Sequence, residues 1–255
     1  MKKILLSVAG YDPTSGAGVS LDQKVFHILG FQGMAALTSV TSQNTKHVKE
    51  VQCLPPEFLW NQYTTLCKDV TFSGIKIGMA GCGKNIPIIK KILADNPNIQ
   101  KVVDPVFKSS SGKWLLEKKF LPIYISGIKG KASLLTPNLE EAGLISGISI
   151  KNKEDMKKAA KSIHSLTHIP CFIKGGHFPG QIINLLYDGK EFFLFKKGKL
   201  KKKVHGTGCF LSSSLLAYLV QGNSLDKSCF LATQLTHEAI KKAAQIGQGQ
   251  FIFSF

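Results

Sequence analysis

Short apolar runs and longer amphipathic stretches alternate along the whole chain. The runs KILLSVA (3–9) and MAALTSVTS (34–42) are bounded by glycine, proline or polar residues, which is typical of buried strands. Between them, VSLDQKVFHILG (19–30) carries apolar residues at helical spacing and closes on a glycine. Further strands are predicted at 72–78, 101–104, 132–136 and 171–174, and further helices at 55–67, 85–94, 138–146, 153–166, 209–220 and 224–245.

This alternation predicts a single doubly wound α/β domain over residues 1–255, with a mainly parallel sheet flanked by helices. One stretch departs from it, because INLLYDGKEFFLF (183–195) predicts a small β-hairpin that turns at Asp188-Gly189. In doubly wound sheets, ligands bind beyond the carboxyl ends of the strands. We therefore expect one edge of the sheet to gather the residues at or just after strand ends: Gly10, Gly78, Asp104, Thr136, Pro137 and Asn138.

The stretch HGTGC (205–209) stands directly before an apolar helical run. Its glycines allow close backbone approach, and free N–H groups at a helix start face outward at the positive end of the helix dipole. That arrangement suits a phosphoryl group, and it lowers the pKa of a thiol such as that of Cys209. The alternative is an ordinary helix start in which Cys209 is a small buried residue.

The stretch TPNLEEA (136–142) places Asn138 and Glu141 three residues apart where a helix begins. Such a pair can share one face and hold magnesium largely through water. It can equally form a capping box, with Asn138 as the cap and Glu141 reaching back. Asp104, the last residue of the predicted strand 101–104, can likewise bind a metal or close a turn.

Three further stretches offer candidate anion or substrate contacts. In IKGGH (173–177), Lys174 ends a strand before paired glycines, where its ammonium can meet a phosphate. The loop AGYDPTSGAG (9–18) lacks the glycine spacing of known nucleotide motifs and fits a substrate loop leading into Asp22. The run KKGKLKKK (196–203) can attract phosphates or nucleic acid, or it can be the solvated edge of the hairpin.

Composition changes this picture in three ways. The net charge of +17 comes from 33 lysines and no arginine, against 16 acidic residues, and lysine alone lacks the planar fork used for base recognition. The six cysteines show no metal-like spacing, so we expect reduced thiols in a cytoplasmic protein. No stretch approaches the roughly 18–20 apolar residues that cross a membrane, so a membrane is not an expected partner. Because the positive charge comes from lysine alone, nucleic acid is not an expected partner either.

Taken in order, these stretches resemble the hydroxymethylpyrimidine/phosphomethylpyrimidine kinases of thiamine biosynthesis, within the ribokinase-like superfamily. The resemblance implies phosphorylation of a pyrimidine's hydroxymethyl group, and then of the monophosphate, with ATP and Mg²⁺. We also expect a homodimer. The motifs that carry the resemblance cover most of the chain: AGYDPTSGAGVSLDQK (9–24), TSQNT (41–45), KIGM (76–79), VVDPV (102–106), LLTPNLEEA (134–142), IKGGH and HGTGC.

The resemblance also implies roles for individual residues. Cys209 becomes the candidate catalytic base, and Asn138 and Glu141 act around magnesium. Asp22 and Gln43 suit the donors and acceptors of an aminopyrimidine edge. The anion hole falls on Gly206, Thr207 and Gly208, the substrate contacts on Gly10, Asp22, Gln43, Met79 and Val106, and the phosphate contacts on Asp104 and Lys174.

The sequence departs from the family pattern at Tyr11, Ser15 and Phe107, in the basic stretch KSSSGK (108–113) and in the tail GQGQFIFSF (247–255). Tyr11 and Phe107 are expected to reshape the pyrimidine pocket, and the tail bears on carboxyl-terminal packing.

Two alternatives stay open. A pyridoxal or pyridoxine kinase phosphorylates the same kind of planar ring alcohol, although Gln43 and Met79 favour the pyrimidine. A lysine-rich nucleic-acid-binding protein without kinase activity would rest on the charge run 196–203, where phenylalanines precede the lysines rather than alternate with them.

Overall fold

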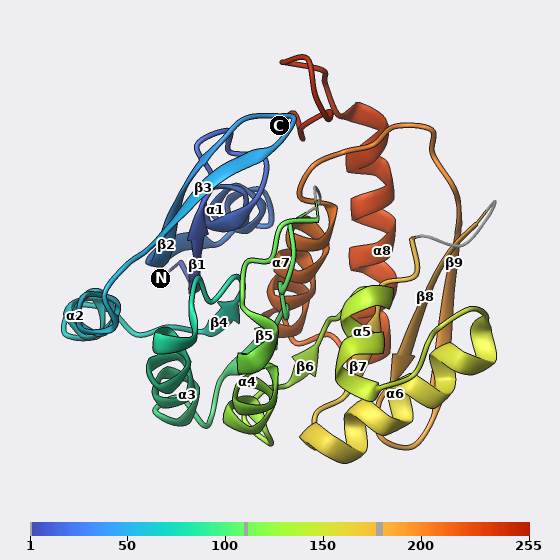
Figure 1. Cartoon of the computed structure of the whole chain (residues 1–255), viewed down its shortest axis with the longest axis horizontal. Helices are drawn as coiled ribbons and strands as arrows, with labels where there is room; N and C mark the ends of the chain where they lie inside the picture. The colour runs from blue at the N-terminus through green and yellow to red at the C-terminus, as the bar shows by residue number, and fades with distance from the viewer. Residues whose placement is uncertain (1, 110–111, 177–180) are drawn as a thin grey trace.

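A nine-stranded sheet runs through the described residues, 2–109, 112–176 and 181–255, in the order β3-β2-β1-β4-β5-β6-β7-β8-β9 of this computed structural model (Figure 1). The central strands pair in parallel, and antiparallel strands extend both ends of the sheet. The parallel strands are β1 (Ile4–Tyr11), β2 (Gln32–Gln43), β4 (Gly74–Ile77), β5 (Gln100–Val103), β6 (Leu134–Leu135) and β7 (Cys171–Ile173). The antiparallel strands are β3 (Val48–Cys53), β8 (Gln181–Tyr187) and β9 (Phe192–Gly198).

Helices cover both faces of the sheet, because neighbouring residues of each buried strand point to opposite sides. Leu5 packs with α1 (Gly18–Ile28), α7 (Thr207–Val220) and α8 (Leu225–Lys242), whereas Leu6 packs with the helices of the other face. Those are α2 (Pro56–Cys67), α3 (Ile86–Ala94), α4 (Leu121–Ile128), α5 (Leu139–Ser146) and α6 (Lys153–Thr167), with the 3₁₀ turns η1 (Gly83–Asn85) and η2 (Lys118–Phe120) between them.

The observed elements confirm the predicted fold class and most element positions. The hairpin β8–β9 turns at Asp188, whose carboxylate accepts hydrogen bonds from the backbone N–H groups of Lys190 and Glu191. The lysine run continues the edge strand β9, as the solvated-edge interpretation requires. The sequence pattern missed α4 and β3, and β3 is an edge strand in which three residues are exposed and none is buried.

The prediction that the cysteines are reduced thiols does not hold for two of the six. Cys53 and Cys82 form a disulfide with their Cα atoms 6.0 Å apart, so the expectation that every cysteine is a reduced thiol is wrong for this pair. They are 29 residues apart in the chain, and the fold brings them together because Cys53 pairs with Ser39 of β2 and Gly81, next to Cys82, packs against the same serine. No helix in the described part of the chain is long and apolar enough to span a membrane. His177 of the IKGGH motif, and Ser110 and Ser111 of KSSSGK, lie outside the described residues.

Candidate active site

The carboxyl ends of the parallel strands meet at one edge through a relay of backbone hydrogen bonds. The N–H of Gly78 donates to the carbonyl of Val8 at 2.9 Å, and that of Asp104 donates to Ile77 at 2.8 Å. Beyond them, the N–H of Thr136 donates to Val103 at 2.9 Å. The predicted gathering of strand-end residues is therefore formed.

At this edge, HGTGC begins α7, two residues earlier than predicted. The cap residue, Gly206, has φ 75° and no side chain to occupy the first-turn amides. A Cβ on Gly206 would lie 1.9 Å from the carbonyl oxygen of Gly16, so the two glycine loops of the sequence touch at this point. The N–H groups at the start of a helix bind anions when no side chain caps them.

An ion pair of a half-buried lysine and a buried aspartate lies beside that helix start. Lys174 Nζ lies 2.5 Å from Asp104 Oδ1, and the Ser212 hydroxyl donates to Asp104 Oδ2 at 3.0 Å. Burial raises the pKa of Asp104, but the ammonium groups of Lys174 and Lys76 outweigh it and hold the pKa below its ordinary value. A Cβ on Gly208 would lie 3.1 Å from Lys174 Nζ. The ammonium therefore rests against the first turn of α7, where its predicted phosphate would bind.

Asn138 and Glu141 form the capping box that was the alternative to a metal site. Glu141 N donates to Asn138 Oδ1 at 2.9 Å, and Asn138 N donates to Glu141 Oε2 at 2.7 Å. A backbone bridge between Asn138 and Lys174 joins this helix start to the ion pair. Burial raises the pKa of Glu141 to about 7, while Lys174 lowers it and Asp104 raises it further.

The side chains at this edge can hold magnesium only together with water and substrate phosphates. No group of three or more His, Cys, Asp or Glu side chains among the described residues could hold a metal by itself. Magnesium keeps several waters and is commonly bound through one or two carboxylates and substrate phosphates. Asn138 and Glu141 supply an amide oxygen and a carboxylate beside the phosphate-facing helix start, which fits that mode; their magnesium role remains a prediction.

Cys209 lies in the first turn of α7 and corrects a second prediction. Burial of its thiol raises the pKa to about 11, although Lys76 and the Gly18 N–H act in the opposite direction. The expectation that the helix start favours the thiolate is therefore wrong for the protein without ligands. Desolvation of a charged sulfur, together with the nearby carboxylates of Asp22 and Asp104, outweighs the helix dipole.

A second ion pair lies beneath Cys209. Lys76 Nζ lies 2.5 Å from Asp22 Oδ1, and both side chains are fully buried. Ser213, one helical turn after Cys209, donates to Asp22 Oδ1 at 2.8 Å, and Ser7 donates to Asp22 Oδ2 at 2.6 Å. Burial lowers the pKa of Lys76, but Asp22 outweighs it and the pKa is raised.

This pairing bears on the substrate contact predicted for Asp22. Three protein donors occupy the carboxylate and leave it unexposed, so the structure shows it as part of the support of α7 rather than open to a ligand. Its contact with substrate remains an untested prediction. Sequence reasoning gave no role to Lys76 or Ser213, although a lysine inside the apolar strand IKI (75–77) was a usable signal.

The other predicted substrate positions lie at the same edge. A Cβ on Gly10 would lie 2.9 Å from Ser39 Oγ and 3.0 Å from Met79 Sδ, so Gly10 and Met79 face one another. Gln43 ends β2, where it helps, against the effect of burial, to hold the pKa of Asp12 below its ordinary value, and Val106 follows Asp104 by a tight turn. The structure brings Gly10 and Met79 together and places Gln43 and Val106 at strand ends of the same edge; the contacts of all four with substrate remain predictions.

The departures from the family pattern have separate outcomes. Phe107 is buried and packs edge-on against Tyr124, with 5.6 Å between the ring centroids. It is therefore a core residue, and its expected effect on the pocket is not seen. Ser15 has φ 55°, which glycine adopts more readily, and Tyr11 is 40% exposed beside the loop.

One contact that the sequence did not indicate fastens the two glycine loops. His205 Nε2 lies 2.8 Å from Asp12 Oδ2, and the His205 N–H donates to the Phe251 carbonyl at 2.8 Å. The tail then returns to α7, where Phe253 packs on Phe210 with 4.4 Å between ring centroids. The atypical tail therefore packs against the first turns of α7 and stabilises the start of that helix.

Comparison with known proteins decides the family. The family model described as phosphomethylpyrimidine kinase matches residues 12–253. The chain belongs to this family. It is 37% identical to a hydroxymethylpyrimidine/phosphomethylpyrimidine kinase of Aquifex aeolicus, over 99% of this chain and 100% of that protein. It is 34% identical to a thiamine biosynthetic bifunctional enzyme of Arabidopsis thaliana, of which it covers 48%.

Solved structures agree with this assignment. A phosphomethylpyrimidine kinase from Clostridium difficile 630 superposes with a TM-score of 0.82 at 33% identity, covering 94% of this chain and 100% of that chain. A pyridoxal kinase from Staphylococcus aureus in complex with pyridoxal superposes with a TM-score of 0.92 at 29% identity, covering 100% and 93%. The family, the ribokinase-like fold and the phosphotransferase class that the sequence motifs indicated are thus confirmed.

Proposed function

We propose that this phosphomethylpyrimidine kinase family member uses ATP to phosphorylate the hydroxymethyl group of 4-amino-5-hydroxymethyl-2-methylpyrimidine, and then the resulting monophosphate. The observation that carries the proposal is the meeting of the uncapped start of α7 with the Lys174–Asp104 pair. Phosphoryl transfer asks mainly for positioning and charge neutralisation, and this edge supplies both. Two relatives named for this activity, of which the chain covers 100% and 91%, support the choice of substrate.

In this proposal the amides of residues 206–209 and the Lys174 ammonium hold the equatorial oxygens of the transferred group. Asp104 keeps that ammonium in place, since its other oxygen is held by Ser212. Bound magnesium would neutralise charge on the phosphates, and Asn138 and Glu141 would hold it through water.

Cys209 would accept the proton of the attacking alcohol. Only its thiolate can do so, and with a pKa of about 11 the thiolate is a minor species at neutral pH. Lys76, the strongest favourable charge on that sulfur, serves as its counter-ion. A thiolate of high pKa is also a strong base, which offsets part of the cost of its low population.

A pyridoxal kinase is the second candidate, favoured by the TM-score of 0.92 with the Staphylococcus aureus enzyme. An ATP-consumption assay with the hydroxymethylpyrimidine, its monophosphate and pyridoxal as separate acceptors separates the two. We expect the highest kcat/KM with the pyrimidines. A preference for pyridoxal would reject the proposal. We also propose that the protein is a homodimer, which gel filtration tests.

A further inference from the structure

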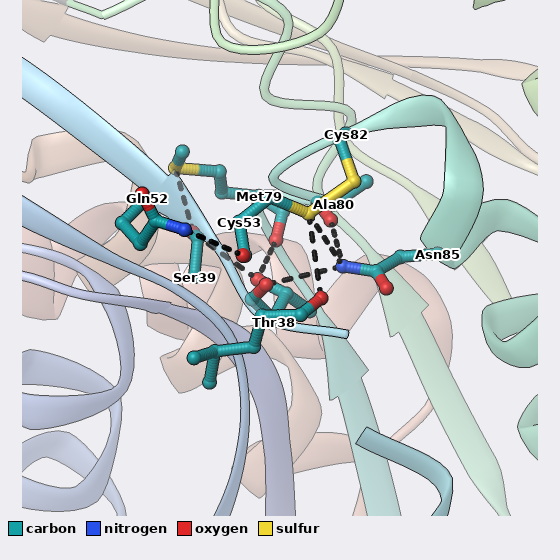
Figure 2. The surroundings of a disulfide bond; sticks show 9 residues. Thr38, Ser39, Gln52, Cys53, Met79, Ala80, Cys82 and Asn85 are labelled. Carbon is teal, nitrogen blue, oxygen red and sulfur yellow. Dashed lines mark hydrogen bonds between the residues drawn. A yellow bond between two sulfur atoms is a disulfide. The ribbon is translucent and has the colours of Figure 1, made fainter. Parts of the chain in front are cut away.

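The Cys53–Cys82 disulfide lies beside the backbone of the predicted pyrimidine contact Met79, as Figure 2 shows. Cys53 ends β3 and stands opposite Ser39 of β2, whereas Cys82 follows the Met79 segment and precedes η1. The bond therefore joins the β2–β3 pair to the segment that leaves β4.

Two hydrogen bonds join Met79 to β2, the strand that pairs with Cys53. The Thr38 hydroxyl donates to the Met79 carbonyl oxygen at 2.7 Å, and Ser39 Oγ lies 3.9 Å from Met79 Sδ. Gly81 lies so close to β2 that a Cβ there would be 2.9 Å from Ser39 Cβ. Making or breaking the disulfide can therefore move Met79 through its contacts with β2 and through the Gly81 segment that joins Met79 to Cys82.

The surroundings suit both oxidation states. The buried side chain of Asn85 donates to the carbonyl oxygens of Thr38 and Ala80 and, at 3.4 Å, to Cys53 Sγ (Figure 2). In the dithiol state, the Cys53 thiol has an acceptor at hand, because its sulfur lies 3.5 Å from the Leu54 carbonyl oxygen. Both cysteines are partly exposed, so small thiol reagents can reach them.

We infer that Cys53 and Cys82 form a reversible thiol–disulfide site that orders the substrate side of the active site. A low-molecular-weight disulfide such as glutathione disulfide is the oxidant. The thiolate of one cysteine attacks it and releases one glutathione thiol, and the second cysteine then displaces the other from the mixed disulfide. Two electrons and two protons leave the protein's thiols, and two glutathione thiols are formed.

The kinetic part of this inference rests on the proposed function. The bond restrains the Met79 segment but not the phosphate-facing start of α7, so reduction should raise KM for the hydroxymethylpyrimidine and leave KM for ATP unchanged. Ordering one side chain on binding corresponds to a rise of about 2- to 10-fold.

The chemical part is tested on the full chain equilibrated in mixtures of reduced and oxidised glutathione, then alkylated and analysed by peptide mass. We expect a single intramolecular link, Cys53 to Cys82, that is lost in Cys53→Ser and in Cys82→Ser and kept in the control Cys67→Ser, whose thiol is exposed and free. If no glutathione mixture links this pair, the site is rejected.

Coupling to the pocket is measured without using activity. In protein labelled at the methionine methyl groups, the NMR signal of Met79 should shift between the oxidised and reduced forms. The signal of Met156, a buried core residue of α6, should not shift. An unmoved Met79 signal overturns the coupling. A shifted signal in a protein that phosphorylates no pyrimidine would reject the proposed function and leave this site standing. If KM for ATP changes as much as KM for the pyrimidine, the assignment to the substrate side is wrong.

Discussion

Lys76 Nζ lies 2.5 Å from Asp22 Oδ1, with both side chains fully buried beneath the first turn of α7. Burying one charge without its partner is strongly unfavourable, because neither water nor an opposite charge compensates it. This pair therefore controls both the stability of the helix start and the charge that Cys209 experiences.

Lys76→Met should lower the free energy of unfolding by about 3–5 kcal/mol, because it leaves the Asp22 carboxylate buried and unpaired. Urea denaturation measures the loss. In the double variant Lys76→Met/Asp22→Asn the amide oxygen can still accept from Ser213, and the amide N–H can donate to the Ser7 hydroxyl oxygen, so we expect less destabilisation than the sum of the two single variants. An additive result would show that the two charges do not depend on one another.

The first phosphorylation should accelerate with pH. The base form of Cys209 is the thiolate, and with a pKa of about 11 its fraction rises roughly tenfold per pH unit throughout the neutral range. We expect kcat/KM for the hydroxymethylpyrimidine to climb from pH 6 to pH 9 without a plateau. A plateau near pH 7 would mean that bound substrates lower the pKa of the thiol or that another group is the base.

Glu141 should make stability depend on pH. Its pKa is raised to about 7 in the folded protein, so the folded state holds the proton more tightly than the unfolded chain, whose value is 4.5. This contribution is fully present below pH 4.5 and is lost as pH rises through about 7. Glu141→Gln keeps an acceptor for Asn138 N and removes the charge, so its stability relative to the natural protein should rise between pH 5 and pH 8 by on the order of 3 kcal/mol.

Denaturation in the presence of EDTA measures this difference without magnesium. Glu140→Gln is the matched control, because Glu140 is the exposed neighbour in the same helix. A relative stability of Glu141→Gln that stays constant with pH would contradict the raised pKa.

Features that depend on neighbouring residues could be predicted from the sequence, and features that join distant segments could not. Apolar periodicity is local, so the strands and helices of the sheet were predictable, and the strand-end rule then brought Asp104, Asn138 and Lys174 to one edge. The Cys53–Cys82 bond and the Asp12–His205 contact join segments that are distant in the chain, and no spacing encodes them. The pKa of Cys209 was mispredicted because desolvation depends on the surrounding fold, whereas the helix dipole can be inferred from the sequence alone.

Cys209→Ala should separate the two phosphorylations. The hydroxymethyl group must lose a proton on attack, so removing the base should lower kcat for the first step by about 10²- to 10⁴-fold. The monophosphate loses its second proton with a pKa of about 6, so its attacking oxygen needs no base at neutral pH. The second step should therefore lose far less, because it relies on the α7 amides and Lys174. Rapid-quench assays with each acceptor measure both steps, and Cys67→Ala, at an exposed free cysteine, controls for the loss of a thiol. Equal losses in the two steps would assign Cys209 to positioning of the phosphate rather than to proton removal.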